Sequence, residues 1–318
     1  MFVEVVDTYI TGQVQLRFLW YPEMDDIKLM AFDDCDQVKY CGEACERERW
    51  PQHEEACEKK GGAELREELL FQLLLRDERL FKQPESTHMG DCPICMIPLP
   101  LDRQKSIMYA CCSKIICNGC VYVTAIKKKA MWLLPLCPFC REPATIIEEE
   151  QDKRHMKRVE ANDPEAMCHE GKQQYEKGDY RSAFKYFTKA AELGDAEAHY
   201  QLSLLYHEGE GVDKDKEKEI HHYEEAAIGG HPRARYNLGA CEWNNGNPER
   251  SVKHWIIAAT QGHDESINAI MKCFKEGLFV GKDVLDATLR AHKAAVDATR
   301  SPQREEAEEF EKGRRGRC

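Results

Sequence analysis

Cysteine pairs with two intervening residues occur three times in the middle of the chain: Cys92 with Cys95, Cys117 with Cys120, and Cys137 with Cys140. A gap of two residues lets a tight turn direct two thiolates at one tetrahedral metal ion. The adjacent residues Cys111 and Cys112 raise the number of candidate ligands to eight, which is enough for two sites. We therefore expect two structural zinc ions here, and structural zinc contributes on the order of 10 kcal/mol to the folding of so small a segment.

Cysteine usage across the whole chain favours metal ligation over disulfides. Twelve of the sixteen cysteines lie between Cys35 and Cys140, and the other four are scattered: Cys168, Cys241, Cys273 and Cys318. The residues after Met1 lack the basic start and the apolar run of a secretory signal, so we expect the protein in the cytosol or the nucleus. In a reducing compartment, clustered cysteines bind metal more often than they form disulfides.

Composition and charge disfavour several classes of protein. The chain has 318 residues, of which 42% are hydrophobic and 32% charged, as in a soluble globular protein of several modules. No apolar run approaches the roughly eighteen residues of a membrane span, so we expect no membrane segment. The net charge of -12 argues against nucleic acid as the main partner, because phosphate binding is driven by clustered Lys and Arg.

Two connecting segments flank the central cysteines. Leucines recur with helical spacing between Glu64 and Phe81, and Pro84 follows, so we expect a helix that ends before this proline. Its apolar stripe should pack against a zinc module or against a partner protein. The charged run from Glu148 to Arg154 is typical of a connector.

The chain beyond Asn162 is repetitive. Alanine pairs recur at intervals of 36, 32 and 36 residues: Ala190-Ala191, Ala226-Ala227, Ala258-Ala259 and Ala294-Ala295. This period indicates a helical solenoid, in which small residues let paired helices approach closely. Each unit should open on a helix, at Glu165, Glu197 or Arg233, and turn at a glycine. Large side chains are expected to fill the core between the helices: Tyr200, Leu204, Tyr206, Tyr223, Tyr236, Leu238 and Trp255.

The segment Tyr200-Gln-Leu-Ser-Leu-Leu-Tyr-His-Glu-Gly-Glu-Gly-Val212, followed by Ala226-Ala227 and Gly230, resembles the Sel-one-like repeat, a relative of the tetratricopeptide repeat. The resemblance covers about three and a half repeats. It implies an α-helical solenoid whose concave face holds another protein. Glu219 and Ser251 stand where the family usually has alanine, so we expect looser helix packing at both positions.

The eight central cysteines resemble a RING finger of the all-cysteine kind. The resemblance implies two interleaved ligand sets: Cys92, Cys95, Cys117 and Cys120 on one zinc ion, and Cys111, Cys112, Cys137 and Cys140 on the other. The family pattern normally leaves at least one residue between the third and fourth ligands, whereas Cys111 and Cys112 are adjacent. Consecutive side chains diverge in extended backbone, so both can reach one ion only if the chain turns there.

The residues from Cys35 to Cys57 resemble the latter part of a MYND zinc finger, through Tyr40-Cys41 and the step Trp50-Pro-Gln-His53. The implied ligands are Cys35, Cys41, Cys45, His53 and Cys57. The family pattern has three more cysteines upstream, and residues 1–34 contain none, so we expect at most one zinc ion in this finger. Alternatively, His53 and its neighbours form the end of a surface helix.

The order of the modules and two short segments together resemble a multi-domain family from microalgal genomes. The segments are Leu80-Phe81-Lys82-Gln83-Pro84 before the RING-like segment and Ser301-Pro302-Gln303-Arg304 after the repeats. The expected fold is mostly α, with a helical solenoid preceded by small zinc-stabilised α+β modules. The expected divisions are an unassigned segment (1–34), a partial MYND-like finger (35–57), a helical spacer (58–87), a RING-type finger (88–145), a charged linker (146–161), the repeats (162–300) and a charged tail (301–318).

Two functions remain open. The chain is a ubiquitin ligase that recruits a charged ubiquitin-conjugating enzyme on the RING finger and holds a protein substrate on the repeats, or it is a non-enzymatic adaptor stabilised by zinc. A conventional metal enzyme is disfavoured, because protein ligands close every proposed zinc site and leave no position for a catalytic water.

The RING resemblance also implies which residues would contact a conjugating enzyme. Ile94, Trp132 and Pro138 would form an apolar groove, and Arg141, directly after the eighth ligand, would contact both the enzyme and ubiquitin. A planar guanidinium suits this role because it donates several hydrogen bonds at once. Alternatively, Ile94 and Pro138 are ordinary residues of zinc knuckles, Arg141 is a surface charge, and Trp132 belongs to a core.

Overall fold

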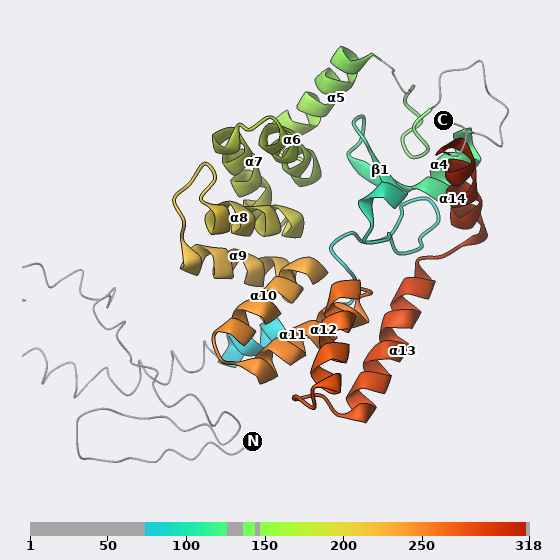
Figure 1. The fold of residues 1–318 in the computed structure, drawn as a ribbon. Coiled ribbons are helices and arrows are strands. Elements are labelled where there is room, and N and C mark those ends of the chain that lie inside the picture. Colours follow the sequence, from blue (N-terminus) through green and yellow to red (C-terminus); the bar gives the residue numbers. More distant parts are fainter. Residues whose placement is uncertain (1–73, 126–135, 144–146, 316–318) are drawn as a thin grey trace, which may run out of the picture. The chain divides into compact units, whose positions relative to one another are not determined.

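The computed structural model describes residues 74–125, 136–143 and 147–315. The chain divides into two compact units, Met1–Leu73 and Leu74–Cys318, and all of the described residues belong to the second. This unit is mostly helical (Figure 1). None of its described helices is long and apolar enough to span a membrane.

Consecutive helices form the repeat solenoid: α6 (Pro164–Glu176), α7 (Tyr180–Glu192), α8 (Ala196–Glu208), α9 (Lys216–Ile228), α10 (Pro232–Asn244), α11 (Pro248–Thr260), α12 (Asp264–Lys275) and α13 (Lys282–Ala298). They pack in pairs along the chain, α6 with α7, α8 with α9, and α10 with α11 (Figure 1). An aspartate precedes four of these helices, and its carboxylate accepts a backbone N–H of the first turn: Asp163, Asp179, Asp195 and Asp215. The predicted mostly α fold with a helical solenoid is confirmed.

The small residues of the repeat pattern are mostly buried in the solenoid. Ala190, Ala226 and Ala258 have no exposed surface, so each permits the close approach expected of it. The prediction is wrong for Ala294 of the fourth pair, which is exposed on α13, whereas Ala295 is half-buried. The chain leaves the solenoid after α13, and no further helix in the described part of the solenoid covers that face.

The looser packing expected at Glu219 and Ser251 is not observed. Their exposed fractions are 3% and 0%, and the helix pairs that contain them are as closely packed as α6 and α7. The Glu219 carboxylate is bonded by Lys216 Nζ at 2.9 Å and by His207 Nδ1 at 3.1 Å. These partners satisfy the carboxylate where the family has an apolar methyl group.

Residues 74–81 form the described part of the predicted spacer helix, which ends before Pro84. We expected this helix to pack against a zinc module or against a partner protein, whereas the last turn of this part packs on the repeats. Leu80 is 1% exposed within a core that includes Tyr200 and Tyr223. Phe81 lies against the ring of His254, with 4.6 Å between ring centroids.

The segment that carries the central cysteines is small. After the short 3-10 helix η3 (Arg103–Lys105), strands β1 (Ser106–Tyr109) and β2 (Lys114–Cys117) form an antiparallel hairpin in which Ser106 faces Cys117. Helix α4 (Asn118–Ala125) follows β2 directly. Below, residues 88–143 are called the cysteine segment, of which 88–125 and 136–143 are described.

Two further helices occupy the stretches expected as a charged linker and a charged tail. Helix α5 (Glu148–Glu160) packs on α6 and buries Val159 in the first core of the repeats. Helix α14 (Pro302–Arg315) returns from the end of the repeats and packs on α4 (Figure 1). The cysteine segment therefore contacts the helix that follows the last repeat.

Candidate metal centres

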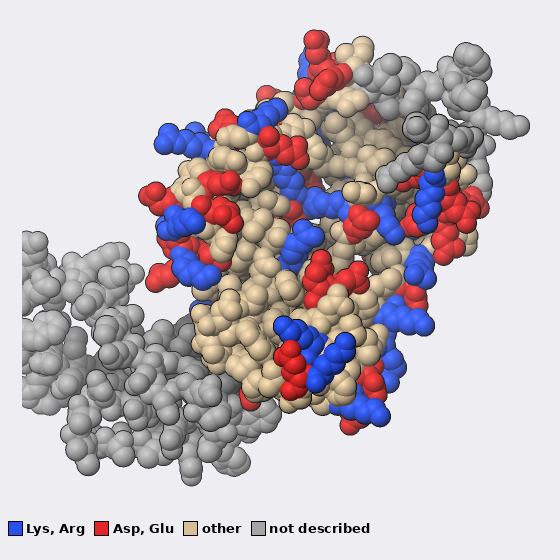
Figure 2. Space-filling model, in the orientation of Figure 1, with Lys and Arg blue, Asp and Glu red and all other residues tan. Residues whose placement is uncertain are grey.

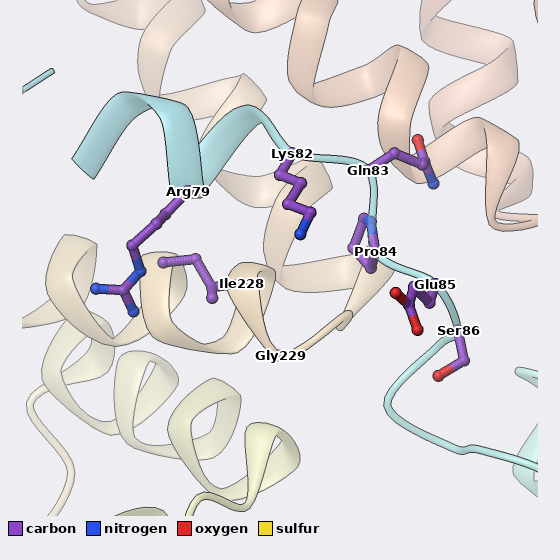
Figure 3. A pocket seen from close by; sticks show the side chains of 8 residues that line it. All are labelled: Arg79, Lys82, Gln83, Pro84, Glu85, Ser86, Ile228 and Gly229. Carbon is purple, nitrogen blue, oxygen red and sulfur yellow. The ribbon is translucent and has the colours of Figure 1, made fainter. Parts of the chain in front are cut away.

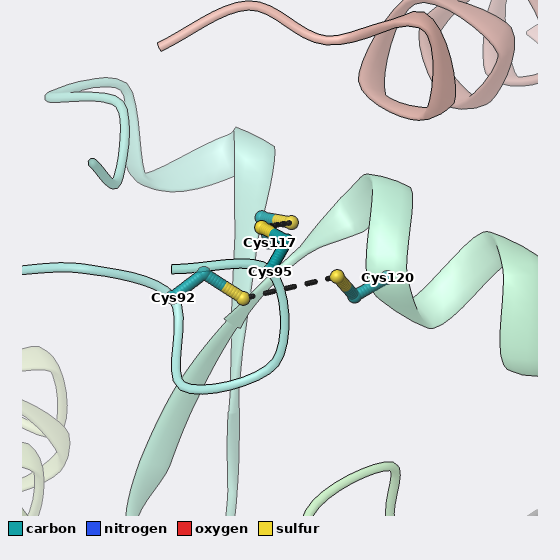
Figure 4. Close-up of side chains that lie close together, drawn as sticks. All are labelled: Cys92, Cys95, Cys117 and Cys120. Carbon is teal, nitrogen blue, oxygen red and sulfur yellow. Dashed lines mark hydrogen bonds between the residues drawn. The ribbon is translucent and has the colours of Figure 1, made fainter. Parts of the chain in front are cut away.

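The first cysteine cluster consists of Cys92, Cys95, Cys117 and Cys120. The Sγ atoms of Cys92 and Cys120 are 3.9 Å apart, and those of Cys95 and Cys117 are 3.8 Å apart (Figure 4). Cys92 and Cys95 lie in a turn before β1, Cys117 ends β2, and Cys120 lies in the first turn of α4. Three of the four side chains are buried, and Cys95 is half-buried.

The second cluster consists of Cys111, Cys112, Cys137 and Cys140. Its Sγ separations are 4.0 Å between Cys111 and Cys112, 3.8 Å between Cys112 and Cys137, and 3.3 Å between Cys111 and Cys140. In each cluster all four sulfur atoms lie within 4.8 Å of one another. The structure therefore brings the eight cysteines together in the two interleaved sets that the RING resemblance implies.

The donor sets suit zinc. Four thiolates placed tetrahedrally about 2.3 Å from a zinc ion are roughly 3.8 Å apart, which is close to four of the five separations given above. Burial raises the pKa of Cys120 to about 12 and that of Cys112 to about 11. Without a cation, such crowded and buried groups could not all be thiolates at neutral pH, whereas a bound divalent ion deprotonates its thiol ligands.

The two outer knuckles have the same backbone geometry. In the first, Cys92 O accepts the N–H of Met96 at 2.9 Å and Cys92 N donates to Ile97 O at 3.0 Å. In the second, Cys137 O accepts the N–H of Arg141 at 3.0 Å and Cys137 N donates to Glu142 O at 2.8 Å. The residue that follows each pair adopts a positive φ, 55° at Met96 and 63° at Arg141. This repeated turn is what directs two sulfur atoms to one point.

The adjacent cysteines lie in the turn between β1 and β2. Tyr109 O accepts the N–H of Cys112 at 3.2 Å and that of Ser113 at 2.8 Å, and Ser113 has a φ of 54°. The chain thus makes the turn that Cys111 and Cys112 need in order to face the same point. Their side chains converge because neither residue is in extended backbone.

The candidate docking residues of the knuckles are accessible. Ile94 is 39% exposed, Pro138 is half-buried, and Arg141 is exposed. Each knuckle also exposes a second large apolar side chain, Met96 at 70% and Phe139 at 44%. Trp132 lies outside the described residues, and so do the MYND-like ligands Cys35, Cys41, Cys45, His53 and Cys57.

A third group of potential ligands, His88, Glu197 and His231, joins the cysteine segment to the repeats. Glu197 Oε2 lies 3.4 Å from His88 Nε2, 3.0 Å from His231 Nε2 and 2.6 Å from Arg103 Nη2, while Lys172 Nζ lies 2.7 Å from Oε1. Burial by itself would raise the pKa of Glu197, but the hydrogen bonds from the two histidines and the charge of Lys172 outweigh it and hold the pKa well below its usual range.

This third group is a charge network and not a metal site. The Nδ1 atom of His231 accepts the backbone N–H of Ala234 at 3.1 Å, so the ring proton is on Nε2. That proton is donated to Glu197, and a protonated nitrogen has no lone pair for a metal. Sequence reasoning used Glu197 only as the start of a repeat and missed this role, because its partners lie on segments far apart in the chain.

The segment that leads into the first cluster is also fixed on the repeats. His88 N donates a hydrogen bond to Gly230 O at 3.0 Å. Gly230 has a φ of 80°, and a Cβ atom on it would lie 2.6 Å from Ser86 O. A residue with a side chain would therefore both strain the turn after α9 and displace the segment that lies on it.

One open pocket lies beside this segment. It has a volume of about 450 Å³ and is lined by the end of the spacer helix, residues 82–86, and the end of α9. Figure 3 shows Arg79 and Lys82 extending from the spacer toward Ile228 and Gly229. On the face drawn in Figure 2, Lys and Arg are interspersed with Asp and Glu and do not form a patch of one sign.

Comparisons with known proteins identify two of the modules. Residues 25–57 match the family model of the MYND finger, and residues 166–195, 196–231 and 232–263 match that of the Sel1 repeat. The chain therefore contains a MYND finger followed by three Sel1 repeats. The MYND match covers the predicted ligands from Cys35 to Cys57 and begins ten residues before them.

Individual relatives match parts of the chain. Chitin synthase regulatory factor 4 of Schizosaccharomyces pombe is 29% identical over 103 residues, which are 30% of this chain and 16% of that protein. A Sel1 repeat protein from Oxalobacter formigenes is 28% identical over 47% of this chain and 64% of its own, with a TM-score of 0.40. The protective antigen c5321 of uropathogenic Escherichia coli, which displays an SLR fold, is 28% identical over 46% and 33%, with a TM-score of 0.38. The chain thus spans less than two thirds of each of these relatives.

The modules define a coarse function. MYND fingers and clusters of four cysteines bind zinc, and Sel1 repeats are modules of protein–protein interaction. The observations indicate a zinc-binding protein that carries modules of protein–protein interaction.

Proposed function

We propose that the cysteine segment is a RING-type module that holds two zinc ions and docks a ubiquitin-conjugating enzyme, while the Sel1 repeats hold the protein to be modified. The chain would then act as a ubiquitin ligase without catalytic residues of its own. The observation that carries the proposal is that Ile94 and Arg141 are exposed and Pro138 is half-buried on two knuckles of equal backbone geometry.

The arrangement of the two clusters supports the zinc part of this proposal. Strand β2 and its hairpin turn carry ligands of both sets, since Cys112 precedes the strand and Cys117 ends it. Two ions would therefore fix the hairpin from both ends. Such a closed set of four thiolates has a structural role, because no ligand position is left for water.

The attachment of the cysteine segment to the repeats supports the role of a coupling device. The Glu197 network and the bond from His88 to Gly230 hold the segment on the solenoid. A conjugating enzyme on the knuckles and a substrate on the repeats would then be held at a fixed separation, which raises their effective concentration.

The second candidate is a non-enzymatic adaptor, in which the knuckles dock a protein other than a conjugating enzyme. It is favoured by the exposed apolar residues Met96 and Phe139, which offer contact area to any protein with a complementary apolar surface. The two candidates share the zinc chemistry and differ in the partner of the knuckles.

Binding measurements on the full chain separate these candidates. Elemental analysis should first find at least two zinc ions for each chain. A panel of purified ubiquitin-conjugating enzymes is then titrated against the wild type, Ile94→Ala and the control Ile107→Ala, which changes an exposed isoleucine of β1. We expect at least one enzyme to bind the wild type and the control but not Ile94→Ala. Binding of none of them would exclude the ligase and retain the adaptor.

A further inference from the structure

One buried cation in the described part of the chain has no carboxylate partner and faces a cysteine cluster. Arg304, in the first turn of α14, is 7% exposed. Its Nη2 atom lies 3.5 Å from Cys95 Sγ, a residue 209 positions earlier in the chain. Burying a charge without an opposite charge is costly, so a negative charge beside this guanidinium would stabilise it.

The guanidinium is held in place by backbone carbonyl groups. Nη1 donates to Pro98 O at 2.7 Å and to Thr299 O at 2.6 Å, and Nη2 donates to Ile97 O at 3.0 Å. Two of these carbonyls belong to the first knuckle. With the bond to Cys95, the guanidinium uses four of its N–H donors. Only arginine has a planar group with so many donors.

A metal-loaded cluster supplies the missing charge. Four thiolates and one zinc ion carry a net negative charge of about two. The first turn of a helix is also the positive end of its dipole, so a cation there is unfavourable unless an anion is near. Arg304 and the start of α14 would both be stabilised by the thiolates of the first cluster.

The rest of α14 is fitted to the same segment. A Cβ atom on Gly119, between two ligands of the first cluster, would lie 2.8 Å from Arg304 N, so only glycine permits this approach. Further along, the rings of Tyr122 and Phe310 are 5.4 Å apart, and Lys105 Nζ lies 2.8 Å from Glu308 Oε1. The helix thus contacts the cluster and the elements that carry its ligands.

We propose that Arg304 is an outer-sphere residue of the metal site formed by Cys92, Cys95, Cys117 and Cys120, and that docking of α14 and metal occupancy of this site stabilise each other. The proposal rests on the zinc occupancy proposed above. The coupling is reciprocal by thermodynamic necessity: if Arg304 strengthens metal binding, then the metal strengthens the docking of α14 by the same factor. The second cluster lies outside this coupling, because Arg304 has no contact with its ligands among the described residues.

The test measures metal loss from each cluster separately. Full-length protein loaded with zinc is treated with EDTA and iodoacetamide, and the alkylation of each cysteine is followed by mass spectrometry. Trypsin cleaves after Lys105, Lys114 and Lys127, so the cysteines of the two clusters fall on different peptides. The variants are Arg304→Gln, Arg304→Lys and Gly119→Ala. The matched control is Arg300→Gln, which removes a 63% exposed arginine four positions away.

We expect Arg304→Gln to accelerate alkylation of the first cluster roughly 10-fold to 100-fold and to leave the second cluster unchanged. Arg304→Lys keeps the charge and should recover part of the loss, whereas Gly119→Ala should resemble Arg304→Gln because it displaces the arginine. With cobalt in place of zinc, Arg304→Gln should also shift the sulfur-to-cobalt charge-transfer absorption to lower energy, since a cation near the thiolate stabilises the sulfur electrons. A residue that only supports the fold would not move this absorption.

Three results would overturn the proposal. Equal alkylation rates in Arg304→Gln and Arg300→Gln would show that Arg304 does not act on the site. Equal acceleration of both clusters would show a general loss of structure. Wild-type protein without zinc would remove the site itself and the proposed function with it, whereas the first two results would leave the zinc proposal intact.

Discussion

The Nη1 atom of Arg235 in α10 donates a hydrogen bond to the carbonyl oxygen of Leu80, 155 residues earlier in the chain. Its Nη2 atom donates to Ala227 O at 2.7 Å, at the end of α9. The arginine has no exposed surface, and burial lowers its pKa to about 10. One side chain therefore satisfies carbonyl groups at the ends of two helices and joins the spacer to the repeats.

Arg235→Lys should lower the free energy of unfolding by about 1.5 to 3 kcal/mol, because lysine cannot reach both carbonyls and leaves one buried acceptor unpaired. Urea denaturation measures the loss, and limited proteolysis should cut the spacer faster. Arg233→Lys, at an exposed position two residues earlier, is the control. Equal unfolding midpoints for the two variants would show that the buried arginine does not hold the spacer.

Gly230→Ala should be more costly than the same change at Gly246. Both glycines have φ near 80°, so both variants incur the strain of a left-handed residue, about 1 to 2 kcal/mol. Only at Gly230 would the new methyl group meet another segment, 2.6 Å from Ser86 O, whereas Gly246 has open space. Thermal melts of the two variants give the comparison. A loss at Gly230 no greater than that at Gly246 would mean that the segment before the first cluster does not pack on this turn.

Ala226→Leu should overpack the solenoid and cost roughly 1 to 3 kcal/mol, because Ala226 has no exposed surface at the contact of α9 with its neighbours. Ala294→Leu makes the same change on the exposed face of α13 and should alter stability little. Unfolding midpoints of both variants test this difference. An unchanged midpoint for Ala226→Leu would contradict the register of the repeats.

The buried imidazole of His254 should make the repeats less stable in mild acid. It has no exposed surface, and both ring nitrogens lack a hydrogen-bond partner among the described residues. Burial, aided by the charges of Arg235 and Arg250, lowers its pKa to about 3. The native state therefore keeps this ring neutral when the unfolded chain, with a histidine pKa of about 6.5, begins to bind a proton.

The sign follows from this difference in bound protons. The contribution of the neutral His254 ring to the free energy of unfolding is fully present above about pH 6.5. It is lost as the pH falls toward the native pKa of His254, at about 1.4 kcal/mol for each pH unit. His254→Leu should therefore lose less stability than the wild type between about pH 6.5 and about pH 5. Urea denaturation at the two pH values measures the loss of unfolding free energy in each protein. Equal losses in the wild type and in His254→Leu would show that His254 is not buried in the neutral form.

The sequence predicts the parts of this molecule whose residues repeat or lie close together. The helix starts of the repeats follow a period that can be counted, and each cysteine knuckle is complete within six residues, so both could be predicted. Arg304 and Cys95 are 209 positions apart, and a lone arginine in a charged tail carries no sign of such a contact. The same holds for Glu197, whose partners come from three separate segments.

Two of the sequence-based predictions that the structure overturned failed for a similar reason. Ala294 follows the repeat period, but a period cannot show where the solenoid ends and its face is left uncovered. The apolar residues of the spacer show only that this helix packs, and not against which element, so they predict a zinc module or a partner protein where the structure has the repeats. Burial of Leu80 among Tyr200 and Tyr223 depends on the arrangement of helices that lie more than a hundred residues away.

The discharge of ubiquitin from a charged conjugating enzyme tests the central claim most directly. It is followed with zinc-loaded wild type, Ile94→Ala and Arg141→Ala against a broad panel of conjugating enzymes. We predict that the wild type accelerates discharge from at least one enzyme, that Ile94→Ala loses binding and discharge together, and that Arg141→Ala retains binding and loses discharge. Wild-type protein with both zinc ions bound that accelerates discharge from no enzyme of the panel would contradict the ligase and leave the adaptor.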